Sequence, residues 1–214
     1  MAHIYIDTNE KQQYCLDAGQ TGEENNVINN NALETIRQFA QTGKSDRETA
    51  DILESIGATI LGVKPASLIN IRSIECLKLC KNYFACSGSV AFVIVKGTEE
   101  KNQLFFYHKQ CLQTVLSDTD TRCCLIRLGY PKQGSADQYV HILTQKMRSA
   151  EFPHEAGFFF GYPYKDVCGF MGAPIPYRKT MGWRMYGDTR LSEMIYNLYR
   201  NARGYVRAVL QAYQ

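Results

Sequence analysis

In one stretch of the sequence, residues 89–107, the hydrophobic pattern becomes typical of strands, and this constrains the fold. Residues 89–96 (SVAFVIVK) are dense in β-branched and aromatic side chains, and residues 103–107 (QLFFY) repeat that character after the polar connection 97–102. Two such runs joined by a short polar segment are typical of a β-hairpin. A hairpin needs further elements to cover it, so the rest of the chain must supply them.

Helices are predicted on both sides of this hairpin. In residues 135–150, Tyr139, Leu143 and Met147 recur at helical spacing. Ser45 is followed three residues later by Glu48, which is the capping-box pattern at a helix start. The predicted helices cover residues 32–41, 45–56, 73–86, 109–117, 119–128, 135–150, 164–170 and 188–212.

Two more strands and one further helix complete the prediction. We expect strands over 155–162 (EAGFFFGY) and 182–186, a short strand at 3–6, and a short helix beginning at Pro65. The predicted fold is α+β: a small, mostly antiparallel sheet of about four strands covered by several helices. Residues 1–45 are predicted to form an arm with a first helix, and 46–214 a single α+β domain.

Composition limits the partners. Hydrophobic residues make up 45% of the chain and charged residues 21%, which suits a folded domain. A net charge of +3 is too small to indicate a nucleic-acid surface, so we expect no nucleic-acid partner. Residues 1–30 are polar and no apolar run approaches the roughly 20 residues of a membrane span, so we expect a cytoplasmic protein without a membrane partner.

Eight cysteines raise the question of disulfides and metals. In a chain of 214 residues expected in a reducing compartment, free thiols are the default. No Cys-x-x-Cys occurs, and structural zinc and thioredoxin-like sites usually need that spacing, so no metal site is predicted.

His154 and Glu155 are candidate catalytic residues. A histidine and a carboxylate can act as a base and its orienting partner. Neighbouring residues on a strand point to opposite faces, however, so on the predicted strand they would not act on one atom together. The competing interpretation is that His154 hydrogen-bonds a turn and Glu155 pairs with a base.

Lys64 and Ser67 are candidate anion ligands. If a helix begins at Pro65, its free N–H groups attract anions, Lys64 adds a positive charge and Ser67 adds a hydroxyl. The Walker pattern is absent, so this is no nucleotide-phosphate loop of that type. The alternative is a plain connection with a solvated Lys64.

The last predicted helix carries Arg200, Arg203 and Arg207 on one face, near Tyr196 and Tyr199. Arginine and tyrosine together can bind phosphates or stack on bases. A solvated helix face with ion pairs is the alternative interpretation.

Three segments together resemble a known family. They are 61–68 (LGVKPASL), 151–170 (EFPHEAGFFFGYPYKDVCGF) and 182–188 (GWRMYGD). They are similar to domain of unknown function 3793, from clostridia and related anaerobic bacteria, over roughly residues 50–210. The resemblance implies no activity. Relatives commonly carry a His-Cys pair where this chain has Ser55 and Ile56, so chemistry by that pair is not expected here.

The preferred functional hypothesis is a binding protein for a small anionic or nucleotide-like ligand. The expected ligand-binding residues are Lys64, Ser67, Tyr162, Asp166, Arg184, Arg200 and Arg203. A hydrolase or transferase centred on His154 is one alternative, and a redox- or iron-linked accessory protein of anaerobes is another. The sequence indicates no particular cofactor and no oligomeric state. The hypothesis requires the three segments to meet around one concavity.

Overall fold

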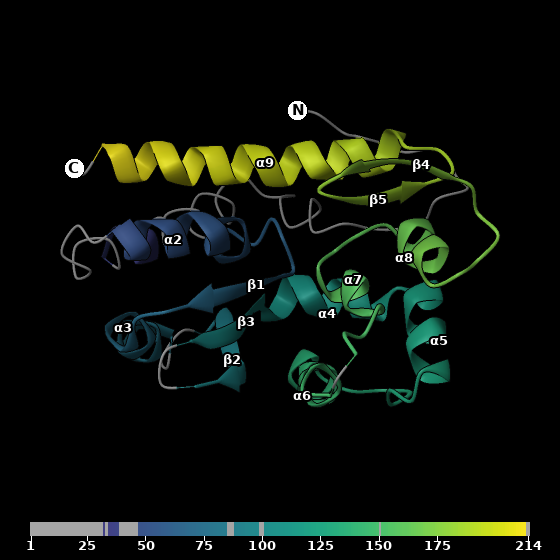
Figure 1. Ribbon diagram of the computed structural model, residues 1–214, viewed down its shortest axis with the longest axis horizontal. Coiled ribbons are helices and arrows are strands. Elements are labelled where there is room, and N and C mark those ends of the chain that lie inside the picture. The colour runs from purple at the N-terminus through teal and green to yellow at the C-terminus, as the bar shows by residue number, and fades with distance from the viewer. Residues whose placement is uncertain are drawn as a thin grey trace.

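The computed structural model describes residues 32, 34–38, 47–84, 88–98, 101–149 and 151–212. Residues 32 and 34–38 are helical and precede the elements of Figure 1. The helices are α2 (Arg47–Ile60), α3 (Ile74–Phe84), α4 (Lys109–Ser117), α5 (Thr119–Arg127), α6 (Ala136–Met147), α7 (Ala156–Phe159), α8 (Tyr164–Phe170) and α9 (Arg190–Gln211). The strands are β1 (Ala66–Ile71), β2 (Val90–Gly97), β3 (Asn102–His108), β4 (Tyr177–Met181) and β5 (Trp183–Tyr186).

The predicted hairpin is β2 and β3, and it forms the centre and one edge of a three-stranded antiparallel sheet. The strand order is β1-β3-β2, with Ala66 opposite Tyr107 at one end of the β1–β3 ladder and Ile71 opposite Asn102 at the other. β4 and β5 form a separate two-stranded antiparallel sheet. The α+β class is confirmed, with its strands divided between two sheets.

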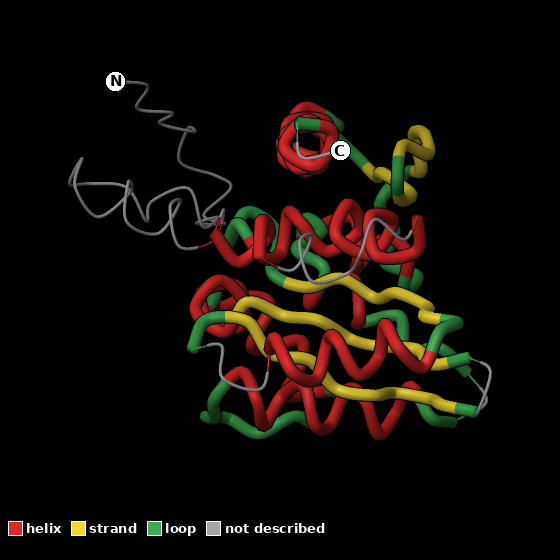
Figure 2. The backbone as a smooth tube through the Cα atoms, turned by 90° about the vertical axis from the view of Figure 1, so that its left-hand side faces the viewer, coloured by secondary structure: helices red, strands yellow, loops and turns green. Residues whose placement is uncertain are grey.

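Both faces of the larger sheet are covered by helices, because its central strand is apolar on both sides. Phe105 and Tyr107 of β3 face a core cluster built with α4 to α8, whereas Leu104 and Phe106 face a second cluster built with α2, α3 and α9. Successive residues of a strand point to opposite faces, which explains this division. Figure 2 shows the strands running between helices.

The longest helix, α9, ties the two parts of the fold together. In Figure 1 it runs along α2 at one end and passes over the β4–β5 hairpin at the other. A Cβ on Gly57 of α2 would lie 2.5 Å from Val206 Cγ2 of α9, so only glycine allows the helices this approach. Glu54 of α2 adds ion pairs to Arg203 and Arg207 of α9.

The strand predicted over 155–162 is wrong. Residues Ala156–Phe159 form the short helix α7, whose first turn is closed by the Ala156 N–H donating to the carbonyl of Pro153. A short apolar run has no usable period, and Phe158 and Phe159 are both fully buried, so the run is equally suited to a buried helix.

The helix predicted to begin at Pro65 is also wrong, because β1 begins at the next residue. Proline has a fixed φ that suits extended backbone, and its carbonyl accepts from the His108 N–H at 2.9 Å, at the edge of the β1–β3 ladder. The strand β4 was not predicted.

Other elements agree with the prediction to within a few residues, among them α4, α5, α8 and β5. The last helix starts at Arg190, with Thr189 at the N-cap in place of the predicted Asp188. The predicted strand at 3–6 and the cap at Ser45 lie outside the described residues. Within the described ranges, no helix is both long and apolar enough to cross a membrane.

Candidate functional site

A cavity of about 480 Å³ lies between the 152–170 segment and β5. Its aromatic lining residues are Phe152, Phe160, Tyr162, Phe170 and Trp183, and its polar ones are His154, Asp166 and Arg184. Gly157, Val167 and Gly182 complete the wall. The volume falls within the roughly 300–1,000 Å³ of typical ligand pockets.

Two glycines shape this wall. A Cβ on Gly157 would lie 2.8 Å from Val167 Cγ2, so a larger residue would push α7 away from α8. Gly182 has φ +76°, and a Cβ there would lie 2.8 Å from the ring of Tyr196 on α9. Both positions therefore need glycine to keep the cavity open and the second hairpin against α9.

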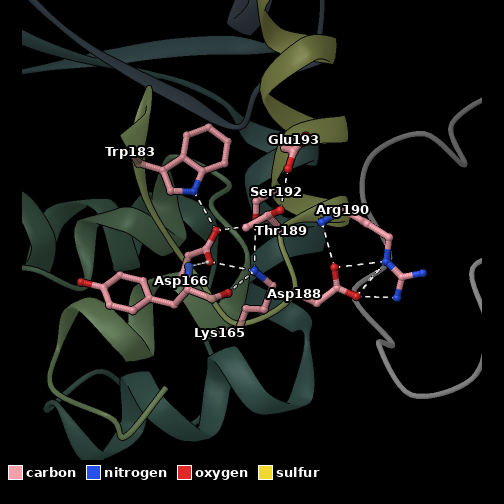
Figure 3. Close-up of polar contacts among 9 residues, drawn as sticks. Lys165, Asp166, Trp183, Asp188, Thr189, Arg190, Ser192 and Glu193 are labelled. Carbon is pink, nitrogen blue, oxygen red and sulfur yellow. Dashed lines mark hydrogen bonds and ion pairs between the residues drawn. The ribbon is translucent and has the colours of Figure 1, made fainter. Parts of the chain in front are cut away.

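Behind the cavity, a hydrogen-bond network centres on the buried carboxylate of Asp166 (Figure 3). Asp166 Oδ2 accepts from Trp183 Nε1 at 2.8 Å and from Ser192 Oγ at 2.6 Å. Asp166 Oδ1 accepts from the Tyr186 N–H and from Lys165 Nζ, both at 2.8 Å. Four donors thus occupy both oxygens.

Lys165 extends the network from α8 to the hairpin and to α9. Its ammonium also donates to the carbonyl of Tyr186 and to Ser192 Oγ, both at 2.8 Å. Ser192 is fully buried, so its contact with Lys165 is a structural link and no substrate reaches its hydroxyl. Asp166 was predicted as a ligand contact; it lines the cavity, and its carboxylate joins three elements and orients Trp183.

The network fixes the aromatic wall. The indole of Trp183 stacks on Tyr162, with ring centroids 4.4 Å apart and an interplanar angle of 15°. Tyr162, a predicted ligand residue, therefore lines the cavity and supports its neighbour. Because the Asp166 bond and the stacking both restrict the indole, this wall is organised without a ligand.

His154 and Arg184 are the polar groups at the opening. Both are exposed, and both contact the ring of Phe170: the His154 ring centroid is 4.8 Å away, and Arg184 Cζ lies 5.4 Å from the Phe170 centroid. Among the described residues, neither side chain has a hydrogen-bond or ion-pair partner. The guanidinium of Arg184 is thus free to meet an anionic group.

Glu155 lies on the other side of the chain from His154. Its buried carboxylate accepts from Lys146 Nζ at 2.8 Å and from Tyr130 Oη at 3.3 Å. Burial, and then the Glu155 charge, raises the pKa of Tyr130. The structure does not bring Glu155 and His154 together, although they are sequence neighbours.

The two candidate anion ligands near residue 65, Lys64 and Ser67, also have different surroundings. Ser67 is buried in β1, where its hydroxyl shares a 2.9 Å hydrogen bond with Thr59. The Lys64 ammonium lies over the rings of Phe160 and Tyr199, at 5.6 and 5.7 Å from their centroids. With the predicted helix start replaced by a strand, no helix N-terminus supports an anion site here.

The arginines of α9 lie away from the cavity lining. Arg203 and Arg207 pair with Glu54, and the Arg207 hydrogen bond together with the Arg203 contacts lowers the Glu54 pKa to about 2. Arg200 is exposed, and none of the described residues pairs with its side chain.

The three family-like segments do meet around Gly161 and Tyr162, where Tyr162 stacks on Trp183 of the 182–188 segment. A Cβ there would lie 2.3 Å from Tyr199 Oη and 2.7 Å from Pro65 Cδ, and Tyr199 Oη donates to the Gly161 carbonyl at 3.1 Å. The cavity itself is lined by two of the segments. The 61–68 segment contributes no lining residue, and its Lys64 contacts the ring of Phe160.

The sequence did not indicate Phe152, Phe160 and Phe170 as cavity residues. The one available signal was the density of aromatic residues in the 151–170 segment, which core packing explains equally well. Phe158 and Phe159 of the same run are indeed core residues, so the pattern alone cannot separate the two roles.

The described residues contain no group of three or more His, Cys, Asp or Glu side chains placed to hold a metal ion. Free thiols in this part of the chain are Cys76, Cys80, Cys123, Cys124 and Cys168. Cys111 is disulfide-bonded, so the expectation of free thiols is wrong for that residue.

Comparison with known proteins gives one match. No curated protein and no solved structure is significantly similar to the chain. The family model described as "Protein of unknown function (DUF3793)" matches residues 52–214, which include every residue of the cavity and of the Asp166 network. The chain belongs to this DUF3793 family.

Proposed function

We propose that the protein binds a small anionic ligand with a planar ring, such as a nucleotide, in the cavity beside Trp183. The observation that carries the proposal is the exposed, unpaired guanidinium of Arg184 at the opening of an aromatic cavity. Aromatic rings favour a planar group by stacking, and a guanidinium binds carboxylate or phosphate in two-point geometry.

The charges around the cavity agree with an anionic ligand. Asp166 is the one carboxylate in the lining, and its charge is balanced by Lys165 at 2.8 Å. Arg184 adds a positive charge that no described carboxylate neutralises. Since Asp166 is buried and its oxygens are occupied by donors, it would not repel an anion held at the opening by Arg184.

Trp183 offers a direct test, because it is the only tryptophan of the chain. Tryptophan emission is followed while purine and pyrimidine nucleotides, and aromatic carboxylates, are titrated into the protein. A saturable change in emission is expected for at least one class. At a ligand concentration of 100 Kd the folded state gains about 2.7 kcal/mol, so the melting temperature should rise as well.

The matched variants are Arg184→Gln and Arg178→Gln. Both arginines are exposed residues of the second hairpin, but only Arg184 lines the cavity. Arg184→Gln should weaken binding of the anionic ligand at least tenfold, or about 1.4 kcal/mol, while Arg178→Gln leaves it unchanged. A panel that changes neither emission nor melting temperature would contradict the proposal.

A hydrolase or transferase centred on His154 is the second candidate. Its support is that His154 is exposed and lines the same cavity. Glu155 is engaged by Lys146 and Tyr130, so a base in this site would act without that partner. Turnover of a bound ligand that is lost in His154→Gln, while the Trp183 signal persists, would identify this function.

A bacterial, cytoplasmic location and a single α+β domain over 46–214 belong to the same proposal. Five of the six described cysteines are free, which fits a reducing compartment, whereas the disulfide at Cys111 counts against it. Contacts of α9 with both α2 and β5 fit one cooperative unit, so thermal unfolding should show a single transition.

A further inference from the structure

Lys64 is the one candidate ligand residue whose charged group is enclosed without a partner. It is partly buried between α9 and the segment that follows α7, with Phe160 and Tyr199 on two sides of its ammonium. No acceptor lies within hydrogen-bond distance of its nitrogen among the described residues. Lysines in proteins generally keep their ammonium in water or paired, so this environment is unusual.

The charged groups around Lys64 do not compensate it. The positive charge of Arg203 on α9 disfavours the Lys64 ammonium, and Arg203 and Arg207 share the single carboxylate of Glu54. With Lys64 neutral, as the reaction below requires, two arginines and one carboxylate leave a net charge of +1 at this place. The titratable groups of the neighbouring elements, Tyr199 and Tyr162, are partly buried tyrosines that stay neutral, because burial raises the pKa of each.

We propose that Lys64 is a nucleophilic lysine that forms an imine with a small carbonyl compound carrying a negative charge. An amine without hydrogen-bond partners has a free lone pair whenever it is deprotonated, and burial away from water, together with the charge of Arg203, favours that neutral form. The surplus positive charge favours an anionic aldehyde or 2-oxo acid over a neutral carbonyl compound.

The reaction is a condensation without a redox step. The neutral Lys64 Nζ adds its lone pair to the carbonyl carbon, and the oxygen takes up a proton to give a carbinolamine. Loss of that oxygen as water, with the two hydrogens of the amine accounting for the water formed, gives the C=N bond. Amine and carbonyl compound thus become imine and water.

Burial, with a smaller contribution from Arg203, lowers the pKa of Lys64 from 10.5 to about 8. At pH 7 an amine with that pKa is about 9% neutral, about 300 times the neutral fraction of a lysine at 10.5. Limited access to the partly buried nitrogen reduces this advantage, so we expect the labelling rate of Lys64 to be about tenfold or more above that of an exposed lysine.

The test uses the full chain with glyoxylate as the probe and cyanoborohydride to reduce the imine, which leaves a carboxymethyl group on each lysine that reacted. Peptide mass spectrometry gives the rate at each site. Lys64 should react at least tenfold faster than Lys78, which is exposed on α3, and propionaldehyde, a neutral aldehyde, should show a smaller preference.

Three outcomes decide the proposal, and none of them needs a variant that folds. The preference for Lys64 should vanish when the same protein is labelled in denaturant, and its rate in the native protein should rise with a midpoint near pH 8. Equal or slower labelling of Lys64 than of Lys78 in the native protein would overturn it. Trp183 binding of nucleotides is a separate measurement, so this proposal and the cavity function succeed or fail independently.

Discussion

Replacing Asp166 by Asn should destabilise the fold far more than a single surface change, because one carboxylate connects α8, the second hairpin and α9. An amide has one acceptor oxygen where the carboxylate has two. If the amide oxygen keeps Lys165 and the Tyr186 N–H, the NH₂ group faces the Trp183 indole N–H, and one of these donors loses its partner.

The magnitude follows from the burial of the pair. The Asp166 side chain is 1% exposed and that of Lys165 is 17% exposed, so removing the charge leaves an ammonium with little water to solvate it. Breaking a buried ion pair costs about 3–5 kcal/mol, a range that also covers the unsatisfied indole. For a domain of this size the melting temperature should fall by about 6–20 °C.

Thermal unfolding followed by circular dichroism measures this directly, and Asp188→Asn is the matched control. Asp188 also pairs with a cation, Arg190, but their side chains are 47% and 91% exposed, so this loss should stay below about 1 kcal/mol. Equal effects of the two substitutions would show that the Asp166 network does not hold the hairpin to α9, and the reasoning would be refuted.

Three further predictions concern stability. Burying the Lys64 charge opposes folding below its native pKa of about 8. Between pH 8 and 10.5 the free energy of unfolding of the wild type should therefore rise by about 1–3 kcal/mol relative to that of Lys64→Met, measured by urea unfolding at each pH. A difference that stays constant with pH would contradict this. Hydrogen bonding to exposed arginines lowers the Glu54 pKa to about 2, so Glu54→Gln should lower the free energy of unfolding by about 1 kcal/mol at pH 7. That difference should shrink as the pH falls from 4.5 toward 2. An undiminished difference at pH 2 would argue against the ion pairs. Gly57→Ala should destabilise by about 1–3 kcal/mol through overlap with Val206, and the same change should become neutral or stabilising in a Val206→Ala background; destabilisation of equal size in both would point to another cause.

Periodic patterns in the sequence predicted the helices and the central hairpin, because these elements have one polar and one apolar side or a clear polar turn. The same reasoning failed at 155–162, where Phe158 and Phe159 are buried on all sides and no period distinguishes a helix from a strand. It failed at Pro65 as well, because proline suits both a helix start and extended backbone, and only the pairing of Ala66 with Tyr107 decides between them.

The candidate site shows the same division between local and long-range information. Tyr162 and Arg184 were predicted as ligand residues and do line the cavity, and Asp166 lies at its wall with both oxygens occupied. Ser67 was predicted from a helix start that is absent, and its hydroxyl bonds Thr59 in the core. Such contacts depend on where distant segments pack, which local sequence does not specify.

The position of Asp166 also bears on what the cavity can select. A free carboxylate in the wall would attract cationic ligands, but Lys165 neutralises this one and the indole of Trp183 takes part of its hydrogen-bonding capacity. Of the described lining residues, Arg184 therefore supplies the permanent charge that is presented to a ligand. A nucleotide should consequently bind more tightly than its uncharged nucleoside, and Arg184→Gln should remove that difference while the stacking on Trp183 remains. Equal affinity of the wild type for nucleoside and nucleotide would place the anionic group away from Arg184.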